Sequence, residues 1–469
     1  MCISNIIKIG FAKEILNKSH RIDMTSGSIP YKLLVFSLPI IFSGILQLLF
    51  NAADIIVVGQ FAGDESLAAV GSTGSLVNLL TNLFIGLSVG TNVVASHFFG
   101  AKNYNALKDT VHTAMLVSFF CGILLTLIGV TLAEQILRLM QAPENVLKLA
   151  ARYLKIYFAG ITSSMIYNFG SALLRAKGDT KRPLYILLIS GMINVILNLL
   201  FVIFFKMGVS GVAFATVIAQ TAAAIFITAI LKTENDEFKL SFKLLKIDRE
   251  IFIRIMKIGI PAGLQGTLFS FSNVIIQSSV NTFGAITIAG NSAAQNIEGF
   301  VYTAMNGFAQ GTLTFTSQNV GAQKYDRVKK LVLISEILVT AIGLVLGFSV
   351  ILFDVPVLKM YSKNSMTIKT GADRLFIICS TYFLCGMMDV IGNIIRGFGH
   401  SVLPMIVTLA GACGFRILWI ATFFQIPKFH TPKTIYYSYP LSWLITFIVE
   451  LICFIIIFSK VNAQQNCAK

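Results

Sequence analysis

The apolar residues of this chain form twelve long runs, separated by short polar loops and one longer hydrophilic stretch, KTENDEFKLSFKLLKIDRE. At a rise of about 1.5 Å per residue, each run is long enough for one helix that crosses a bilayer with some tilt. The pattern therefore predicts an all-α integral membrane protein with twelve spans, at 32–60, 66–97, 109–132, 151–177, 183–204, 210–232, 253–279, 287–318, 330–354, 372–398, 404–426 and 435–459.

The second half of the sequence repeats the first. GAKNYN at 100–105 aligns with GAQKYD at 321–326, and LRAKGDTKRP at 174–183 aligns with IRGFGHSVLP at 395–404. Both alignments have the same offset along the chain. Six spans are an even number, so both copies enter the membrane from the same side. They are parallel repeats related by an axis along the membrane normal.

The repeat predicts the domain organisation. We expect an N-lobe at 32–232 with helices 1–6, a cytoplasmic connector at 233–252 and a C-lobe at 253–459 with helices 7–12. Two such lobes leave a cleft between them, and substrates of duplicated transporters usually bind at that interface. An old duplication without functional meaning is the alternative interpretation.

Composition agrees with a membrane protein and charge sets its orientation. The chain of 469 residues is 55% hydrophobic and 12% charged, whereas a soluble domain carries about 25% charged residues. The net charge of +16 lies mainly in short loops, without a basic stripe interleaved with aromatic residues, which argues against nucleic-acid binding. Lys and Arg concentrate on the side of both termini, so residues 1–31 (with Met24 as an alternative start), the connector and the tail 460–469 are predicted to be cytoplasmic.

A carboxylate inside the first span is the main candidate functional residue. Asp54, Asn198 and Thr216 each lie six residues from the outer end of their predicted spans, so all three are ~9 Å deep. Asn194 lies one helical turn from Asn198 on the same face. Hard oxygens of this kind suit Na⁺, and the carboxylate can take up H⁺. For the two asparagines, hydrogen bonding between helices is an equally good interpretation.

Other charges also fall inside predicted spans. Glu298 and Asp389 could face the cleft and hold a cationic substrate or a second proton. The alternative is a buried structural pair with Arg396 or Arg416, because paired charges are common inside membranes. Glu450 is expected to be structural. The seven cysteines show no CxxC or Cys/His spacing, so neither a disulfide framework nor a metal site is indicated, apart from Na⁺ at Asp54.

The chain resembles the MATE (multidrug and toxin extrusion) transporters over residues 24–460. The resemblance is carried by SLPIIFSGILQLLFNAADIIVVGQF, GTNVVASHFFGAKN, LLRAKGDTKRPL, GIPAGLQ, LTFTSQNVGAQKYDRVKK and MDVIGNIIRGFGHSVLPM. It implies a V-shaped pair of six-helix lobes around a central cleft. It also implies multidrug efflux: amphipathic, mostly cationic compounds are exported in exchange for inward H⁺ or Na⁺.

The same resemblance assigns roles to particular residues. Asp54 matches the family's coupling acid in the first span, and Asn194, Asn198 and Thr216 match the positions around it. Some members have Asp where this chain has Asn198, which leaves the coupling ion open. One branch of the family has an acid in the seventh span, where this chain has Asn273 and Gln277 but no carboxylate, so Glu298 and Asp389 are expected to replace it.

The predicted mechanism is alternating access without ATP or another cofactor, since no GxxxxGK[ST] motif is present. Pro39 and Pro261, one in the first span of each half, would bend their helices. We expect a monomer in the cell (inner) membrane with the lipid bilayer, H⁺ or Na⁺ and small amphipathic cations as partners. A flippase for a lipid-linked envelope precursor is the main alternative. The sequence contains no catalytic motif of the kind that an integral membrane enzyme would need. A non-transporting scaffold would have no reason to place Asp54 inside a membrane span.

Overall fold

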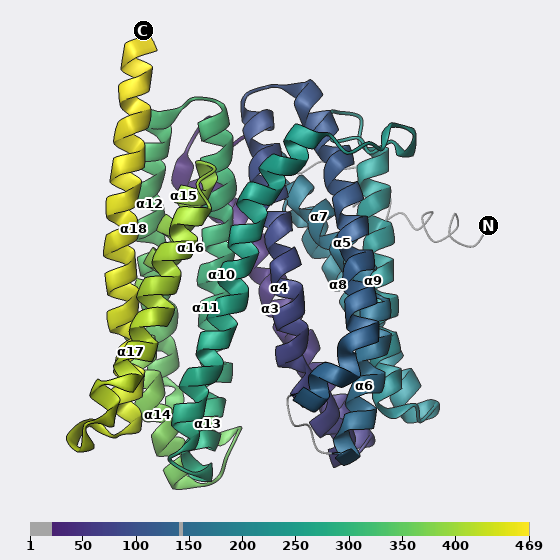
Figure 1. The fold of residues 1–469 in the computed structure, drawn as a ribbon, viewed down its shortest axis with the longest axis vertical. Coiled ribbons are helices and arrows are strands. Elements are labelled where there is room, and N and C mark those ends of the chain that lie inside the picture. The colour runs from purple at the N-terminus through teal and green to yellow at the C-terminus, as the bar shows by residue number, and fades with distance from the viewer. Residues whose placement is uncertain (1–20, 140–143, 469) are drawn as a thin grey trace. The chain divides into compact units, whose positions relative to one another are not determined.

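The computed structural model describes residues 21–139 and 144–468, and every regular element among them is helical. Figure 1 shows the long helices running side by side. Joined across short breaks, the described helices form twelve segments, as predicted. They are α3 (Ile29–Phe61), α4 (Asp64–Gly100), α5 (Tyr104–Leu139), α6 with α7 (Glu144–Ala159, Ile161–Lys177), α8 with the π-helical η1 (Lys181–Leu199, Leu200–Phe204), α9 (Gly208–Thr233), α10 (Arg249–Asn281), α11 (Ala285–Gly321), α12 (Tyr325–Leu352), α14 with α15 (Ser365–Cys379, Phe383–Gly397), α16 with π-helical η3 and α17 (Val402–Thr408, Leu409–Gly414, Phe415–Ala421), and α18 (Pro432–Ala468).

Short elements complete the described chain. They are α13 (Asp354–Lys359) and the 3₁₀ turns η2 (Phe242–Leu244), η4 (Phe423–Gln425) and η5 (Pro427–Phe429). By length and hydropathy alone, eight described helices could cross a membrane, and the pair α14 and α15, bent by 45°, makes a ninth. The other segments, α6 with α7, α10 and α11, carry more polar side chains. Polar side chains on spanning helices normally face the protein interior.

The sequence repeat is also visible in the backbone, because residues with positive φ angles occur at equivalent positions of the two copies. Positive φ angles recur in three pairs at the spacing of the sequence repeat: Gly63 and Gly284 (83° and 86°), Lys102 and Gln323 (56° and 57°), and Gly178 and Gly399 (98° and 89°). The last pair ends α7 and α15, where the amide of each glycine donates to the carbonyl three residues earlier. A left-handed glycine is the usual way to end a helix, because it has no Cβ to clash.

The described residues divide into two compact units that exchange parts of two helices. One unit contains residues 21–24 and 42–263, and the other contains residues 25–41 and 264–468. The divisions within α3 and α10 come two residues after Pro39 and Pro261. A proline inside a helix removes one backbone hydrogen bond and weakens the helix there. Each of these helices therefore changes its packing partners within a turn of its weakest point; bending as part of transport stays a prediction.

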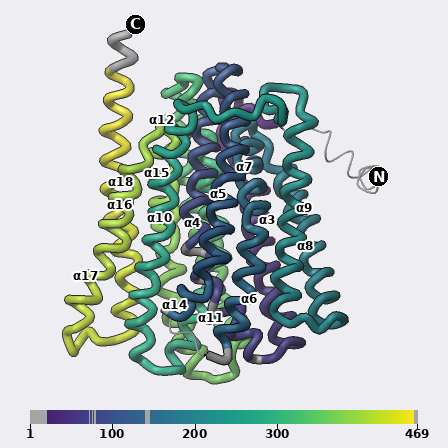
Figure 2. Tube along the Cα trace, turned by 45° about the vertical axis from the view of Figure 1, so that its right-hand side comes forward, coloured from purple at the N-terminus to yellow at the C-terminus, as the bar shows by residue number. Residues whose placement is uncertain are grey.

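Glycines allow very close helix packing in the first unit. A Cβ atom on Gly86 of α4 would lie 2.2 Å from the backbone nitrogen of Gly263 on α10. One on Gly90 would lie 2.4 Å from the carbonyl oxygen of Ile255. The connector after α9, seen in Figure 2 along one end of the helices, also belongs to this unit: the amide of Asp248 donates to the hydroxyl of Thr113 over 3.0 Å.

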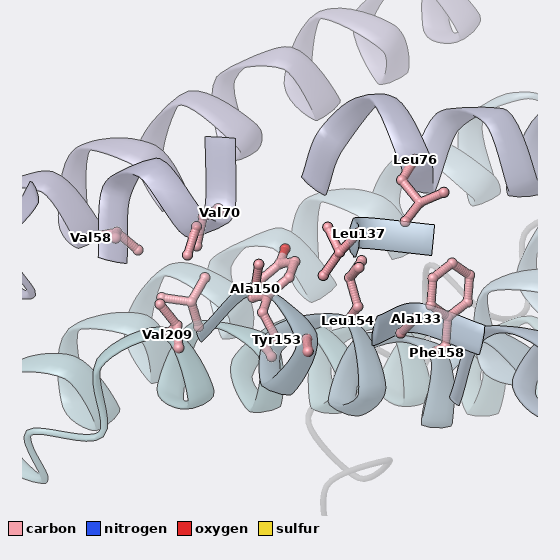
Figure 3. Packing of buried hydrophobic residues seen from close by; sticks show 14 of the residues in the cluster. Val58, Val70, Leu76, Ala133, Leu137, Ala150, Tyr153, Leu154, Phe158 and Val209 are labelled. Atoms are coloured by element: carbon pink, nitrogen blue, oxygen red, sulfur yellow. The ribbon is translucent and has the colours of Figure 1, made fainter. Parts of the chain in front are cut away.

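The apolar core of the first unit joins the C-terminal part of α3 to α4, α5, α6 and α9. Figure 3 shows Tyr153, Leu154 and Phe158 of α6 packed among apolar side chains of the neighbouring helices. Leu154 and Phe158 are fully buried. This packing fixes α6 beside α9, which positions the polar residues described next.

Candidate functional site

The four residues predicted to form a cation site lie together in the first unit. The side-chain amide of Asn198, on α8, donates a hydrogen bond to Oδ1 of Asp54, on α3. The same amide lies 3.4 Å from Oδ1 of Asn194, one turn earlier on α8. The amide of Asn194 in turn donates to the hydroxyl of Thr216, on α9, over 3.3 Å. Three helices thus supply one connected set of oxygens around a single carboxylate.

Helix geometry explains why these side chains meet. Asn194 and Asn198 are four residues apart, so both project from one face of α8. The hydroxyl of Thr216 lies 3.0 Å from the carbonyl of Val212 and also hydrogen-bonds the carboxylate of Asp54. A hydroxyl has only one hydrogen to donate, so Thr216 can bond to the carboxylate or to the helix, but not to both at once.

The site also contains residues that sequence reasoning missed. The hydroxyls of Tyr153 and Tyr157, one turn apart on α6, lie within electrostatic range of Asp54. Gln220, one turn after Thr216 on α9, hydrogen-bonds Tyr157. The spacing of four residues in each pair was the available signal, but tyrosines in an apolar run give no indication of which side they face.

The electrostatics of the site favour a bound cation or proton. None of the ion pairs found among residues 21–139 and 144–468 involves Asp54. The side-chain oxygens of Asn198 and Gln220 are buried without a hydrogen-bond partner. Asp54 is half-buried, and a carboxylate largely removed from water without a counterion is costly unless it binds a cation or is protonated. The arrangement can therefore hold one positive charge and lose it again.

A different arrangement surrounds Glu298 in the second unit. Arg374 of α14 donates two hydrogen bonds to Oε1 of Glu298, one of them from Nε over 3.0 Å. Arg374 also donates to Asn291 over 2.9 Å, and Asn291 donates to Gln277 over 2.9 Å. The structure thus joins two predicted substrate residues, Gln277 and Glu298. The expected partner of Glu298 was wrong: it is Arg374, which lies near the start of its predicted span, and not Arg396 or Arg416.

The remaining predicted residues lie elsewhere in the second unit. Asp389 of α15 hydrogen-bonds Asn306 of α11, and no hydrogen bond in the described chain links it to Glu298. Asn273 is exposed on α10. Arg416 is held without an acid: its Nε donates to the hydroxyl of Ser442 over 2.8 Å, and its guanidinium lies 4.1 Å from the ring centre of Tyr439. This stacking stabilises the buried cation.

Comparison with known proteins decides the family. The sequence model of the MatE family matches residues 39–200 and again residues 261–421. The chain belongs to the MatE family. The two matches begin at the equivalent prolines Pro39 and Pro261, so the family unit is the repeat found within the chain. Proteins of this family are membrane transporters rather than enzymes, and this chain is a multi-pass membrane protein.

Individual relatives and structures agree. The chain is 28% identical to the probable multidrug resistance protein YoeA of Bacillus subtilis (strain 168), over 82% of the chain and 84% of that protein. It is 27% identical to the probable multidrug resistance protein YpnP of the same strain, over 86% and 90%. A structure of a multidrug resistance MATE family transporter in an outward-facing conformation aligns with a TM-score of 0.89, at 21% identity, over 95% and 99% of the two chains. At that identity the likeness shows the fold.

Proposed function

We propose that this protein is a multidrug efflux antiporter that exports amphipathic, mostly cationic compounds in exchange for inward H⁺ or Na⁺. Family membership and two relatives named as probable multidrug resistance proteins support efflux. The single observation that carries ion coupling is the carboxylate of Asp54. It is bonded by neutral side chains and takes part in none of the ion pairs of the described chain. The gradient, and no cofactor, would supply the energy.

The proposed cycle follows from the charge of that carboxylate. A cation or proton from outside neutralises Asp54, and the hydrogen bonds that Asn198 and Thr216 make to it rearrange because they lose a charged acceptor. Thr216 can then turn its hydroxyl wholly to the carbonyl of Val212. Repacking of α3, α8 and α9 around the neutral site would bias the alternating access of the two lobes.

The substrate residues are proposals with unequal support. Asp389 has a buried carboxylate oxygen without a hydrogen-bond partner, which leaves it able to hold a cationic substrate or a second proton. Glu298 is already paired with Arg374, so it would have to release that arginine to bind a cation. Gln277 is part of the same network, and Asn273 is exposed. We therefore rank Asp389 first.

The experiment measures export of ethidium into a substrate-free medium from proteoliposomes that contain the purified protein. An H⁺ gradient and a Na⁺ gradient are imposed in separate runs on wild type, Asp54→Asn and the exposed control Glu65→Gln. We expect one gradient to drive export in wild type and in the control, with a loss of at least tenfold in Asp54→Asn. Equal gradient-driven export by Asp54→Asn would remove Asp54 from the coupling step.

A second variant addresses the identity of the ion. Asn198→Asp adds a carboxylate next to Asp54 and so supplies another hard, charged oxygen for Na⁺. If wild type is driven by H⁺, this variant should gain a response to the Na⁺ gradient. No export of ethidium under either gradient would count against the antiporter, and movement of a lipid-linked pyrophosphate under the same conditions would then favour the flippase.

A further inference from the structure

The second unit contains buried carboxylates that have no role in the proposed coupling site at Asp54. Glu450 of α18 is 1% exposed. Its Oε1 accepts a hydrogen bond from the hydroxyl of Thr408 over 3.0 Å, and its Oε2 has no partner. The carboxylate lies against Gly392 of α15, where a Cβ atom would be only 3.3 Å from Oε2. A larger residue at Gly392 would crowd this carboxylate.

A second buried carboxylate, on another helix, lies within electrostatic range of Glu450. Glu336 of α12 interacts electrostatically with Glu450, and both of its oxygens are buried without a hydrogen-bond partner. Neither glutamate takes part in any ion pair of the described residues. Two carboxylates in this position repel each other, and burial penalises the charge of each.

The nearby cation does not neutralise both. Arg396 of α15 interacts with Glu450 and with Asp389, so its one positive charge is already shared. Its guanidinium donates to Asn393 over 3.1 Å and to Gln265 over 2.5 Å, while its Nε has no partner. The carboxylate of Asp389 on α15 also acts electrostatically on Glu450. The remaining groups named around the pair are neutral: α10 contributes Gln265, α16 contributes Thr408, and the thiol of Cys453 lies near Glu450 on α18.

An aromatic layer closes the cytoplasmic end of this region as the predicted orientation places it. Phe398, just after α15, stacks on Tyr325 of α12 at 6.4 Å between ring centres and contacts Phe454 of α18 at 6.1 Å. Phe454 is one turn beyond Glu450 on α18 and packs on Phe458 at 5.6 Å. The layer joins the three helices that carry Glu336, Arg396 and Glu450.

We propose that Glu336 and Glu450 form a second ion-binding site in which the two carboxyl groups together hold one proton. The proton occupies an otherwise unpartnered oxygen of either glutamate, and when it is on Glu336, Glu450 stays ionised as a counterion of Arg396. The hydrogen-bonded chain from Arg396 through Gln265 and Thr408 to Glu450 connects the site to α10 and α16. A change in protonation of the pair would therefore alter hydrogen bonds to α10 and α16. This site does not depend on the proposed role of Asp54.

Infrared spectroscopy can detect the proton without any transport assay. A protonated carboxyl group absorbs at a C=O stretching frequency separate from that of a carboxylate. The full-length protein in lipid nanodiscs would be compared across pH as wild type, Glu336→Gln, Glu450→Gln and the double variant. Near neutral pH, where exposed Asp and Glu are ionised, we expect a carboxylic-acid band in wild type, a shifted band in each single variant and its loss in the double variant. Asp54→Asn and Glu65→Gln should keep the band.

Two results would overturn the proposal: a wild-type carboxylic-acid band near neutral pH that survives in the double variant, or no such band in wild type at that pH. If the double variant does not fold, Thr408→Val offers a test that changes no charge. It removes the hydrogen bond to Oε1 of Glu450 and should shift the band, and an unshifted band in Thr408→Val would also overturn the proposal. Because ethidium export plays no part, failure of the efflux proposal would leave this test intact.

Discussion

The two halves of the chain share their backbone turns but not their buried polar residues. The repeat offset that pairs Gly178 with Gly399 places an isoleucine opposite Asp54 and Trp419 opposite Asn198. In the other direction, Val77 stands opposite Glu298 and Tyr153 opposite Arg374. The duplicated fold is thus maintained by turn and packing positions, while each half carries its own polar set. A function read from one half cannot be transferred to the other by symmetry.

The two sets also differ in how they balance charge. The acid of the first half, Asp54, is bonded by amide and hydroxyl groups, whereas Glu298 of the second half is bonded twice by Arg374. A paired acid is fixed in one state by its partner, and an unpaired one can exchange its cation. On this argument Asp54 is a better place for ion exchange than Glu298, and Glu298 serves structure first.

The largest expected effect comes from breaking the pair in the second half. Arg374→Met leaves Glu298 buried without its cation, and removal of one partner of a buried pair costs about 3–5 kcal/mol. We expect a clear drop in the midpoint of thermal unfolding in detergent. Adding Glu298→Gln to Arg374→Met should recover much of the loss, because the uncompensated charge is gone.

An exposed pair beside it provides the control. Lys433 lies 3.0 Å from Asp373, which adjoins Arg374, and the lysine side chain is 54% exposed. Lys433→Met should cost at most about 1 kcal/mol, as exposed pairs do. If Arg374→Met proved as mild as Lys433→Met, the charge contrast between the halves would be wrong.

A medium effect is expected where the halves have equivalent glycines. Gly86 and Gly307 occupy the same position in the two repeats, but a Cβ atom would lie 2.2 Å from backbone at Gly86 and 2.9 Å from the side chain of Ile41 at Gly307. Gly86→Ala should therefore cost about 1–3 kcal/mol, as overpacking does, and Gly307→Ala less, because the nearest backbone atoms there, N and Cα of Ile41, are 3.0 Å away.

Glycines with free space beside them on the same two helices serve as controls. Alanine at these positions changes helix propensity without causing a steric clash. Gly74 of α4 and Gly299 of α11 have nothing within 4 Å of an added Cβ atom. Alanine there should be neutral or stabilising by up to about 1 kcal/mol. Thermal unfolding of all four alanine variants measures the difference, and equal midpoints for Gly86→Ala and Gly74→Ala would contradict the close packing of α4 on α10.

The sequence was sufficient to predict the helices and the grouping of four polar side chains, for identifiable physical reasons. Apolar runs report directly on membrane helices, and matched depth with helical spacing was enough to bring Asp54, Asn194, Asn198 and Thr216 together. The pairing of Glu298 with Arg374 was missed because Arg374 lies near a predicted span end. Charged side chains are common there and do not indicate a buried ion pair. Glu336 was overlooked inside a long apolar run. Which faces of such helices meet depends on packing that hydropathy does not record.

The smallest effect should come from neutralising the acid of the first half. In Asp54→Asn the new side chain has the same shape, and its carbonyl oxygen can still accept the hydrogen bond from Asn198. No cation of a described ion pair is left behind, so we expect a change in stability within about 1 kcal/mol, the size of one ordinary hydrogen bond. Asp54→Leu removes the acceptor as well and should cost about 1–3 kcal/mol, because the buried amide of Asn198 loses its partner. Thermal unfolding in detergent compares both variants with Arg374→Met. An Asp54→Asn protein as unstable as Arg374→Met would reveal a structural charge at Asp54. A stable Asp54→Asn protein that no longer couples export to the gradient would show that Asp54 acts in coupling, whereas Glu298 with Arg374 maintains the structure.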